Sequence, residues 1–327
     1  MNLYVVFAIV GIIFLFIISF CLEFFIAYKS ITLKNRYQFY LKNTFKTSKI
    51  AITGIFVAIA VMANYFVIPI VPPQTVLITL FSITIGFVGI LYGPLLGTLT
   101  GLLEDVLHYL FNSTGFSYYP GFTFSACLHG FFAGLFVLIF RYIIGRRKTL
   151  VISMISMLVM QILMVFSILL IYSDFSISRS FENIDKKFNG SGLVFLILYF
   201  TIPNFVMIIS FLMPIVKPKK FEHLNVYYMI ILYVLFDQFL ISMVFDNLWV
   251  HDLYGVPIEP LIALKSFLLP MYVVIKFTLT YFPIIAIYNL WPNDTFIGLL
   301  FNNNNSNKCV ENSKIKEISK NQYENFQ

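Results

Sequence analysis

Two carboxylates and an imidazole stand close together within an otherwise apolar part of the chain. Glu104 and Asp105 are adjacent, and His108 follows one helical turn after Glu104. Carboxylates inside an apolar span are costly unless they face a cavity, find partners or become protonated. The two acids could serve a function, or they could only hold helices together through polar contacts. His108 is their nearest local partner, unless it points to the loop that follows.

The chain lacks the motifs of the common nucleotide-using and metal-dependent enzymes. No glycine is followed by lysine, so the phosphate loop G-x-x-x-x-G-K-[ST] does not occur, and H-E-x-x-H and G-x-G-x-x-G are also missing. If ATP drives transport through this protein, another chain must hydrolyse it. We expect no catalytic residue, no metal ligand and no cofactor.

The loop that follows the acidic pair is rich in aromatic residues. Phe116, Tyr118 and Tyr119 precede Pro120 and Gly121, which interrupt the helical pattern. Aromatic rings at this position can belong to the interfacial belt of a membrane protein, or they can stack on a planar ligand.

The amino-acid composition indicates that most of the chain is surrounded by lipid. Apolar residues make up 59% of the 327 residues and charged residues only 11%, whereas globular proteins are about a quarter charged. Residues 51–103 contain no charged residue and no histidine, over a length that can cross a bilayer two to three times. The sequence therefore predicts an all-α, polytopic membrane protein.

About nine transmembrane helices are expected from the apolar runs, with polar or basic segments between them. The predicted spans are 3–27, 51–70, 76–92, 95–111, 122–142, 150–172, 193–216, 226–248 and 261–288.

The net charge of +7 is explained by topology. Basic residues cluster at 29–49, 141–148 and 217–220, each beside an apolar span, and alternate threading puts all three clusters on one side. We therefore expect a multi-pass protein of the cell membrane with the N-terminus outside and the C-terminus cytoplasmic. The basic clusters are expected to contact lipid rather than nucleic acid.

Small residues recur at helical spacing in the central part of the chain. Gly93, Gly97 and Gly101 form one stripe, and Gly130 and Gly134 form another. Such stripes let helix backbones approach closely in lipid, so ordinary close packing explains them best.

Three blocks carry a resemblance to a known family. They read YGPLLGTLTGLLEDVLHYLF at 92–111, YYPGFTFSACLHGFFAGLF at 118–136 and FDNLWVHDLYGVPI at 245–258. The chain resembles the folate-family S component, the substrate-binding membrane subunit of energy-coupling-factor (ECF) transporters. The first two blocks match closely. In the third, Asp246 and Asn247 stand where that family has Asn and Thr, while Trp249, Tyr254 and Gly255 agree.

The resemblance implies a six-helix bundle with additions. Residues 50–148 would supply S-component helices one to four and residues 221–291 helices five and six. Residues 1–49 would add a transmembrane helix and a basic linker, residues 149–220 an inserted helical hairpin, and residues 292–327 a polar, disordered tail.

A vitamin ligand and three partner subunits also follow from the resemblance. The implied function is capture of folate or a related pterin, with a transmembrane coupling subunit and two ATPase subunits as partners. The residues that we expect at the ligand are Asp105, Tyr118, Tyr119, Phe122, Thr123, Asp246, Asn247, Trp249 and Lys265. Gly54 and Ala58 are expected to dock to the coupling subunit through close helix approach. A carboxylate at Asp246 would repel a dianionic ligand unless it is compensated, so a neutral or cationic pterin, or another vitamin, is also credible.

Two other classes of function remain open on sequence alone. A membrane enzyme acting on lipid could use Glu104, Asp105 and His108 as an acid/base or metal cluster. A secondary transporter could use the same carboxylates as proton relays and would work without partner subunits.

Overall fold

The computed structural model describes residues 3–29, 47–65, 68–71, 76–78, 80–111, 118–142 and 224–290, together with residues 155 and 162, and structural statements below refer to these residues. The predicted basic linker, inserted hairpin and polar tail lie outside them. Four of the described helices are long and apolar enough to cross a membrane, namely Leu3–Glu23, Thr47–Tyr65, Pro120–Phe140 and Val226–Tyr254. The expected helical membrane architecture is confirmed.

Three helices in the middle of the bundle hold the rest together. They are α4 (Phe81–Tyr92), α5 (Pro94–Phe111) and α6 (Pro120–Tyr142). The first two meet at Gly93, which has a φ of 101°, a backbone conformation that glycine adopts without steric cost. Pro94 follows as the first residue of α5, where its missing N–H costs nothing.

Glycines bring α5 and α6 into backbone contact, as the two stripes predict. A side-chain carbon on Gly101 would collide with the Ala126 backbone, and one on Gly130 would collide with the Gly97 backbone. The absence of side chains at these positions therefore sets the distance between the two helices.

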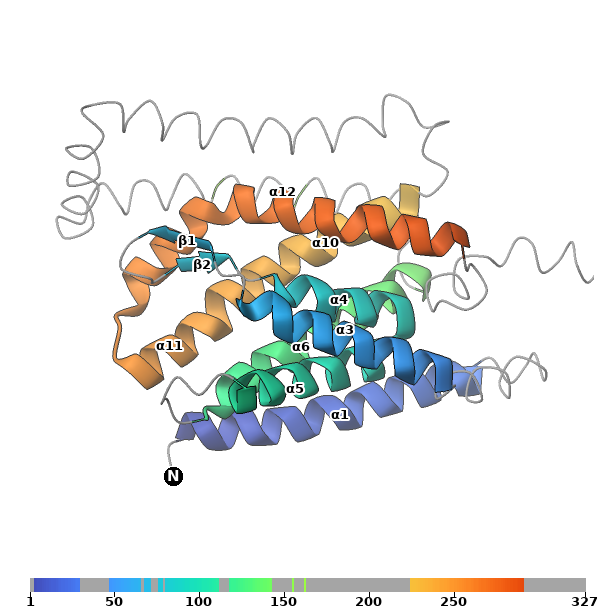
Figure 1. The fold of residues 1–327 in the computed structure, drawn as a ribbon, viewed down its shortest axis with the longest axis horizontal. Coiled ribbons are helices and arrows are strands. Elements are labelled where there is room, and N and C mark those ends of the chain that lie inside the picture. Colours follow the sequence, from blue (N-terminus) through green and yellow to red (C-terminus); the bar gives the residue numbers. More distant parts are fainter. Residues whose placement is uncertain are drawn as a thin grey trace, which may run out of the picture.

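The remaining helices cover opposite sides of this centre (Figure 1). One side carries α10 (Leu224–Phe236), the π-helical segment η3 (Asp237–Phe245), α11 (Asp246–Tyr254) and α12 (Ile258–Leu290). The other side carries α1 (Leu3–Lys29), which packs along α5 and α6. Helix α3 (Thr47–Tyr65) packs against α4 and α5.

One end of the bundle gathers several chain reversals, at the left of Figure 1. There α1 begins, α5 ends, α6 begins, and α11 turns into α12. Gly255 makes the last of these turns with a left-handed φ of 67°, and its N–H donates to the His251 carbonyl at 2.8 Å.

A two-stranded hairpin corrects the predicted boundaries at this same end. Strands β1 (Ile68–Val71) and β2 (Val76–Ile78) pair antiparallel, with Ile68 opposite Ile78. The predicted spans 51–70 and 76–92 are therefore too long, because α3 ends at Tyr65 and α4 begins only at Phe81. Short apolar runs fit a strand and a buried helix equally well, so the pattern alone could not separate them.

The described helices enclose two apolar core clusters. The larger one lies among α4, α6, α10 and α12, and includes Phe87, Tyr228 and Leu269. The second lies among α1, α6, η3 and α11, and is built around Phe124 and Trp249. Of the expected ligand-binding aromatics, Tyr119 and Trp249 belong to this second cluster and Phe122 packs against it, whereas Tyr118 is exposed.

Candidate ligand-binding site

Trp249 is the centre of an aromatic group at the end of the bundle where α6 begins. Its indole is fully buried, and the ring N–H donates to the Ser125 hydroxyl at 3.0 Å. The rings of Tyr119, Phe124 and Phe245 each lie with their centroids 6.2 Å from it. Because the indole N–H already has a partner, the buried ring has its polar atom satisfied inside this group of aromatic side chains.

Tyr119 joins the start of α6 to the end of α11. Its hydroxyl donates to the Asp252 carboxylate at 2.5 Å, and its ring packs edge-on against Phe122 at 5.8 Å. A side chain on Gly121 would overlap the rings of Tyr119 and Trp249. The Pro-Gly-Phe-Thr sequence therefore has a local reason, because glycine leaves room for both rings.

A short chain of hydrogen bonds runs beside these aromatics. The Thr123 hydroxyl donates to Asp105 at 2.5 Å, and the Tyr118 hydroxyl lies 2.5 Å from the same Thr123 oxygen. Tyr118 is also in edge contact with Tyr109, at 5.3 Å between ring centroids. The structure thus brings Asp105, Tyr118 and Thr123 together, as a carboxylate and two hydroxyls at the junction of α5 and α6.

The two adjacent carboxylates point to different helices. The Asn64 amide of α3 donates to Glu104 at 2.5 Å, whereas Asp105 is bonded to α6. His108 packs its ring against Tyr65 at 5.6 Å. The other carboxylate oxygen of Glu104 is buried and has no hydrogen-bond partner among the described residues. The three residues therefore do not form the converging cluster that an acid/base or metal-dependent enzyme would need.

The remaining expected ligand residues are Asp246 and Asn247, where η3 passes into α11, and Lys265 on α12. The Asn247 side-chain amide donates to the Met243 carbonyl at 2.8 Å, and its buried oxygen has no partner among the described residues. Lys265 of α12 donates to the Ser242 carbonyl at 2.7 Å, and Asp246 lies within electrostatic range of it. Asp246 and Lys265 form a second polar group, and Asn247 follows Asp246 on the helix that carries Trp249.

Comparison with known proteins decides the family. Residues 42–218, more than half of the chain, match the profile of the family described as ECF-type riboflavin transporter, S component. The chain belongs to this family. It is therefore a membrane-embedded vitamin transporter subunit and not an enzyme. No curated protein and no solved structure gives a match to it.

The match bears on only part of the predicted domain organisation of this S component. It begins at residue 42, after α1, and it continues through most of residues 149–220 before it ends at residue 218. The assignment of that segment as an insertion stays a prediction.

The predicted docking residues of the S component lie on an open face of α3. Gly54 and Ala58 are both exposed, and a side-chain carbon built on Gly54 would have no neighbour within 4 Å. Ile55 and Met62 on the same helix are also exposed, at 60% and 58%. Within the described part of the chain, this face is open to lipid or to another subunit.

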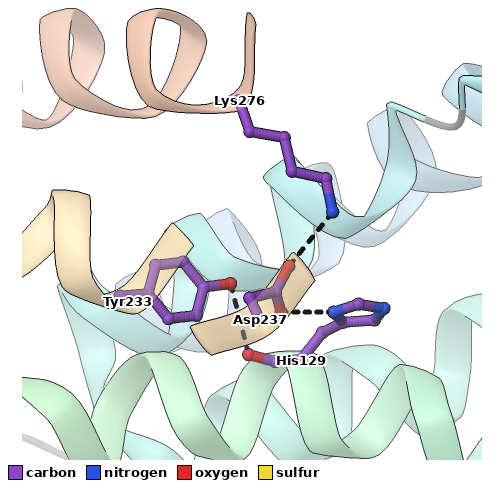
Figure 2. A network of polar contacts seen from close by, with 4 residues as sticks. All are labelled: His129, Tyr233, Asp237 and Lys276. Carbon is purple, nitrogen blue, oxygen red and sulfur yellow. Dashed lines mark hydrogen bonds and ion pairs between the residues drawn. The ribbon is translucent and has the colours of Figure 1, made fainter. Parts of the chain in front are cut away.

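A buried ion network deeper in the S component was not anticipated from sequence (Figure 2). Asp237, the first residue of η3, lies 2.5 Å from the His129 ring nitrogen and 3.0 Å from the Lys276 ammonium. All three residues are at most 8% exposed, and they come from α6, η3 and α12. The Tyr233 hydroxyl donates to the His129 carbonyl at 3.4 Å.

One signal could have pointed to this network. Charged residues inside apolar spans are rare, and Asp237 and Lys276 each lie within one, so each needs a partner. The sequence separations of 108 and 39 residues hide which partner each one has.

Proposed function

We propose that this S component captures a neutral, planar vitamin from outside the cell, and that riboflavin is its ligand. The observation that carries the proposal is the aromatic group around Trp249, with the Asp105–Thr123–Tyr118 chain beside it. Small-ligand sites are mostly apolar, with a few polar groups that fix orientation. A flat fused ring can stack on the aromatic group while its polar edge meets the hydroxyls and the carboxylate. The family described by the matching profile transports riboflavin.

Charge separates riboflavin from the folate ligand that the sequence motifs suggest. Folate carries two carboxylates, and this end of the bundle presents its own carboxylates at Asp105, Asp246 and Asp252. Among the residues that the structure describes, Lys265 is a cation near Asp246, and its ammonium is already bonded to a backbone carbonyl. Bringing two more negative charges here would be unfavourable, whereas the uncharged riboflavin molecule adds none. Folate remains the second candidate because the Pro120–Thr123 motif favours a pterin.

Direct titration of the purified protein distinguishes the two vitamins. Riboflavin is fluorescent, and stacking on aromatic side chains should quench it, so we expect a saturable loss of its emission. Folate should not compete at equal concentration. Saturable folate binding with no riboflavin quenching would reverse the assignment.

A variant at the centre of the site should weaken this binding. Trp249→Ala removes the ring that packs against Tyr119 and Phe124 at the centre of the group, and it should weaken riboflavin binding about tenfold, which corresponds to ~1.4 kcal/mol. Phe282→Ala is the matched control, because this ring of α12 is 65% exposed and should leave affinity unchanged. Equal riboflavin affinities in the two variants would show that Trp249 is not part of the binding site.

We also propose that the α3 face docks to the transmembrane coupling subunit, below which two ATPase subunits supply energy. Gly54→Leu should abolish co-purification of a tagged copy with these subunits, because a large side chain prevents close helix approach. Riboflavin quenching should be unchanged in this variant, and Gly54→Ala should retain the partners. Riboflavin uptake into vesicles by the purified protein alone would instead indicate a secondary transporter.

A further inference from the structure

Helix α1 belongs to the same core cluster as the proposed ligand-binding aromatics. Ala8 and Leu15 of α1 are buried in that cluster together with Tyr119, Phe124 and Trp249. Yet α1 lies wholly before residue 42, where the match to the family begins. This helix therefore lies outside the matched residues, and it packs directly against the proposed site.

The first half of α1 touches the central tryptophan. The Phe7 ring lies 6.4 Å from the Trp249 ring and 5.9 Å from the Phe124 ring, between centroids. One turn further on, Gly11 faces Phe124 so closely that a side-chain carbon there would overlap the Phe124 ring. Since Phe124 also contacts Trp249, α1 supports the indole both directly and through one intermediate ring.

The second half of α1 is held to α5 by two polar contacts. The Ser19 and Thr98 hydroxyls lie 3.2 Å apart, and the buried Glu23 carboxylate accepts the Leu95 N–H at 3.1 Å. Leu95 is in the first turn of α5, where N–H groups lack helical partners and a negative charge is favourable. A rotation of α1 would break both contacts, so they fix which face of α1 meets the core.

We propose that α1 forms a wall of the ligand site, in which Phe7 is a positioning residue that sets the orientation of Trp249 and thereby the affinity for the vitamin. This inference rests on the proposed function for its ligand. The placement of Trp249 by α1 stands on the contacts alone.

The test compares two phenylalanines of α1 in the full-length protein. Phe7→Ala removes the ring that contacts Trp249. Phe20→Ala is the matched control, because its ring is similarly exposed, 59% against 51%, and thirteen residues of helix put it about 20 Å further along. Both variants carry Trp291→Phe, so that Trp249 is the single tryptophan of the chain and reports its own surroundings.

Two readouts are expected to change together. In Phe7→Ala the emission of Trp249 should shift and riboflavin should bind about three- to tenfold more weakly, as for loss of one aromatic pair. Phe7→Tyr, which keeps the ring, should restore both properties. Phe20→Ala should leave both at the parent level.

Several outcomes would overturn the inference. Unchanged Trp249 emission in Phe7→Ala would show that α1 does not position the indole. A shifted emission with unchanged riboflavin affinity would show that α1 is only a structural neighbour of the site. If the parent protein binds neither riboflavin nor folate, the proposed function fails on its own, and the emission comparison still decides whether Phe7 positions Trp249.

Discussion

Asp237 illustrates how single residues are stabilised in this molecule. A lone carboxylate in the membrane interior is expensive, and here its two oxygens are shared between His129 and Lys276. Since the three side chains come from three helices, the network ties α6, η3 and α12 at one depth. Such buried ion pairs are costly to break, although they add little stability compared with a well-packed apolar core.

The network predicts a difference between single and double variants. Lys276→Met leaves Asp237 with one partner fewer and should lower the free energy of unfolding by about 3–5 kcal/mol. Asp237→Asn combined with Lys276→Met removes both charges and should recover part of that loss. Unfolding in SDS titrations from mild detergent measures both variants, with Thr278→Val, an exposed position on the same helix, as control. A double variant that is less stable than Lys276→Met alone would contradict the coupling between Asp237 and Lys276.

Glu104, Asp105 and His108 show how far residue patterns reach. The sequence correctly marked the two carboxylates as groups that need partners. It could not identify Asn64 and Thr123 as those partners, because neither is a helical neighbour of the acids. Side-chain direction about the helix decides this, and that direction depends on which helices surround α5.

The pairing of α5 and α6 is the most constrained feature at the scale of elements. Each helix has a glycine at the point where the backbone of the other passes. By contrast, Gly54 of α3 faces open space, although it also belongs to a stripe of small residues. Identical patterns therefore serve two purposes, internal packing and a free surface.

This contrast gives a paired prediction. Gly101→Ala adds a carbon that meets the Ala126 backbone and should destabilise the protein by about 1–3 kcal/mol, as for overpacked cores. Gly54→Ala adds the same carbon where nothing lies within 4 Å, and stability should change by less than about 0.5 kcal/mol. The same SDS titration measures both. A greater loss at Gly54 would contradict the assignment of the two faces.

Most described helices were predictable from hydropathy, while their irregularities were not. The predicted 95–111 and 122–142 spans agree with α5 and α6 to within two residues. The hairpin β1–β2 and the π-helical turns of η3 depend on backbone hydrogen bonds that apolar patterns do not encode.

The whole molecule presents its proposed ligand site at one end. The first residues of α1, the start of α6 and the α11–α12 turn meet there (Figure 1). The positive-inside pattern predicts that this end faces the outside, while the tail carries Cys309 on the inner side.

A labelling experiment tests this orientation. All samples carry Cys21→Ser, because Cys21 is exposed, whereas Cys127 is buried and contributes no signal. A membrane-impermeant maleimide should not reach Cys309 in intact cells and should label it after permeabilisation. Tyr254→Cys, at a position that is 51% exposed at the end of α11, should be labelled in intact cells when Cys309 is replaced by serine. The reverse labelling pattern would show that the protein has the opposite orientation in the membrane.

At this scale the sequence predicted several residues that lie close together in the fold, but not all of their neighbours. Tyr119, Phe122 and Trp249 were expected together. In the structure the Tyr119 ring contacts both the Phe122 ring and the Trp249 ring. Phe7 was not expected there, because more than 240 residues separate it from Trp249. Only the arrangement of whole helices brings the two rings together.

The glycine contacts between α5 and α6 have a consequence for engineering new specificities. Because each backbone occupies the room that a side chain of its neighbour would fill, neither helix can be exchanged alone for its counterpart from another vitamin carrier. A chimera that transplants both helices and their connecting loop as one cassette keeps the complementary surfaces intact. Such a chimera should assemble, and grafts of a single helix should fail to assemble.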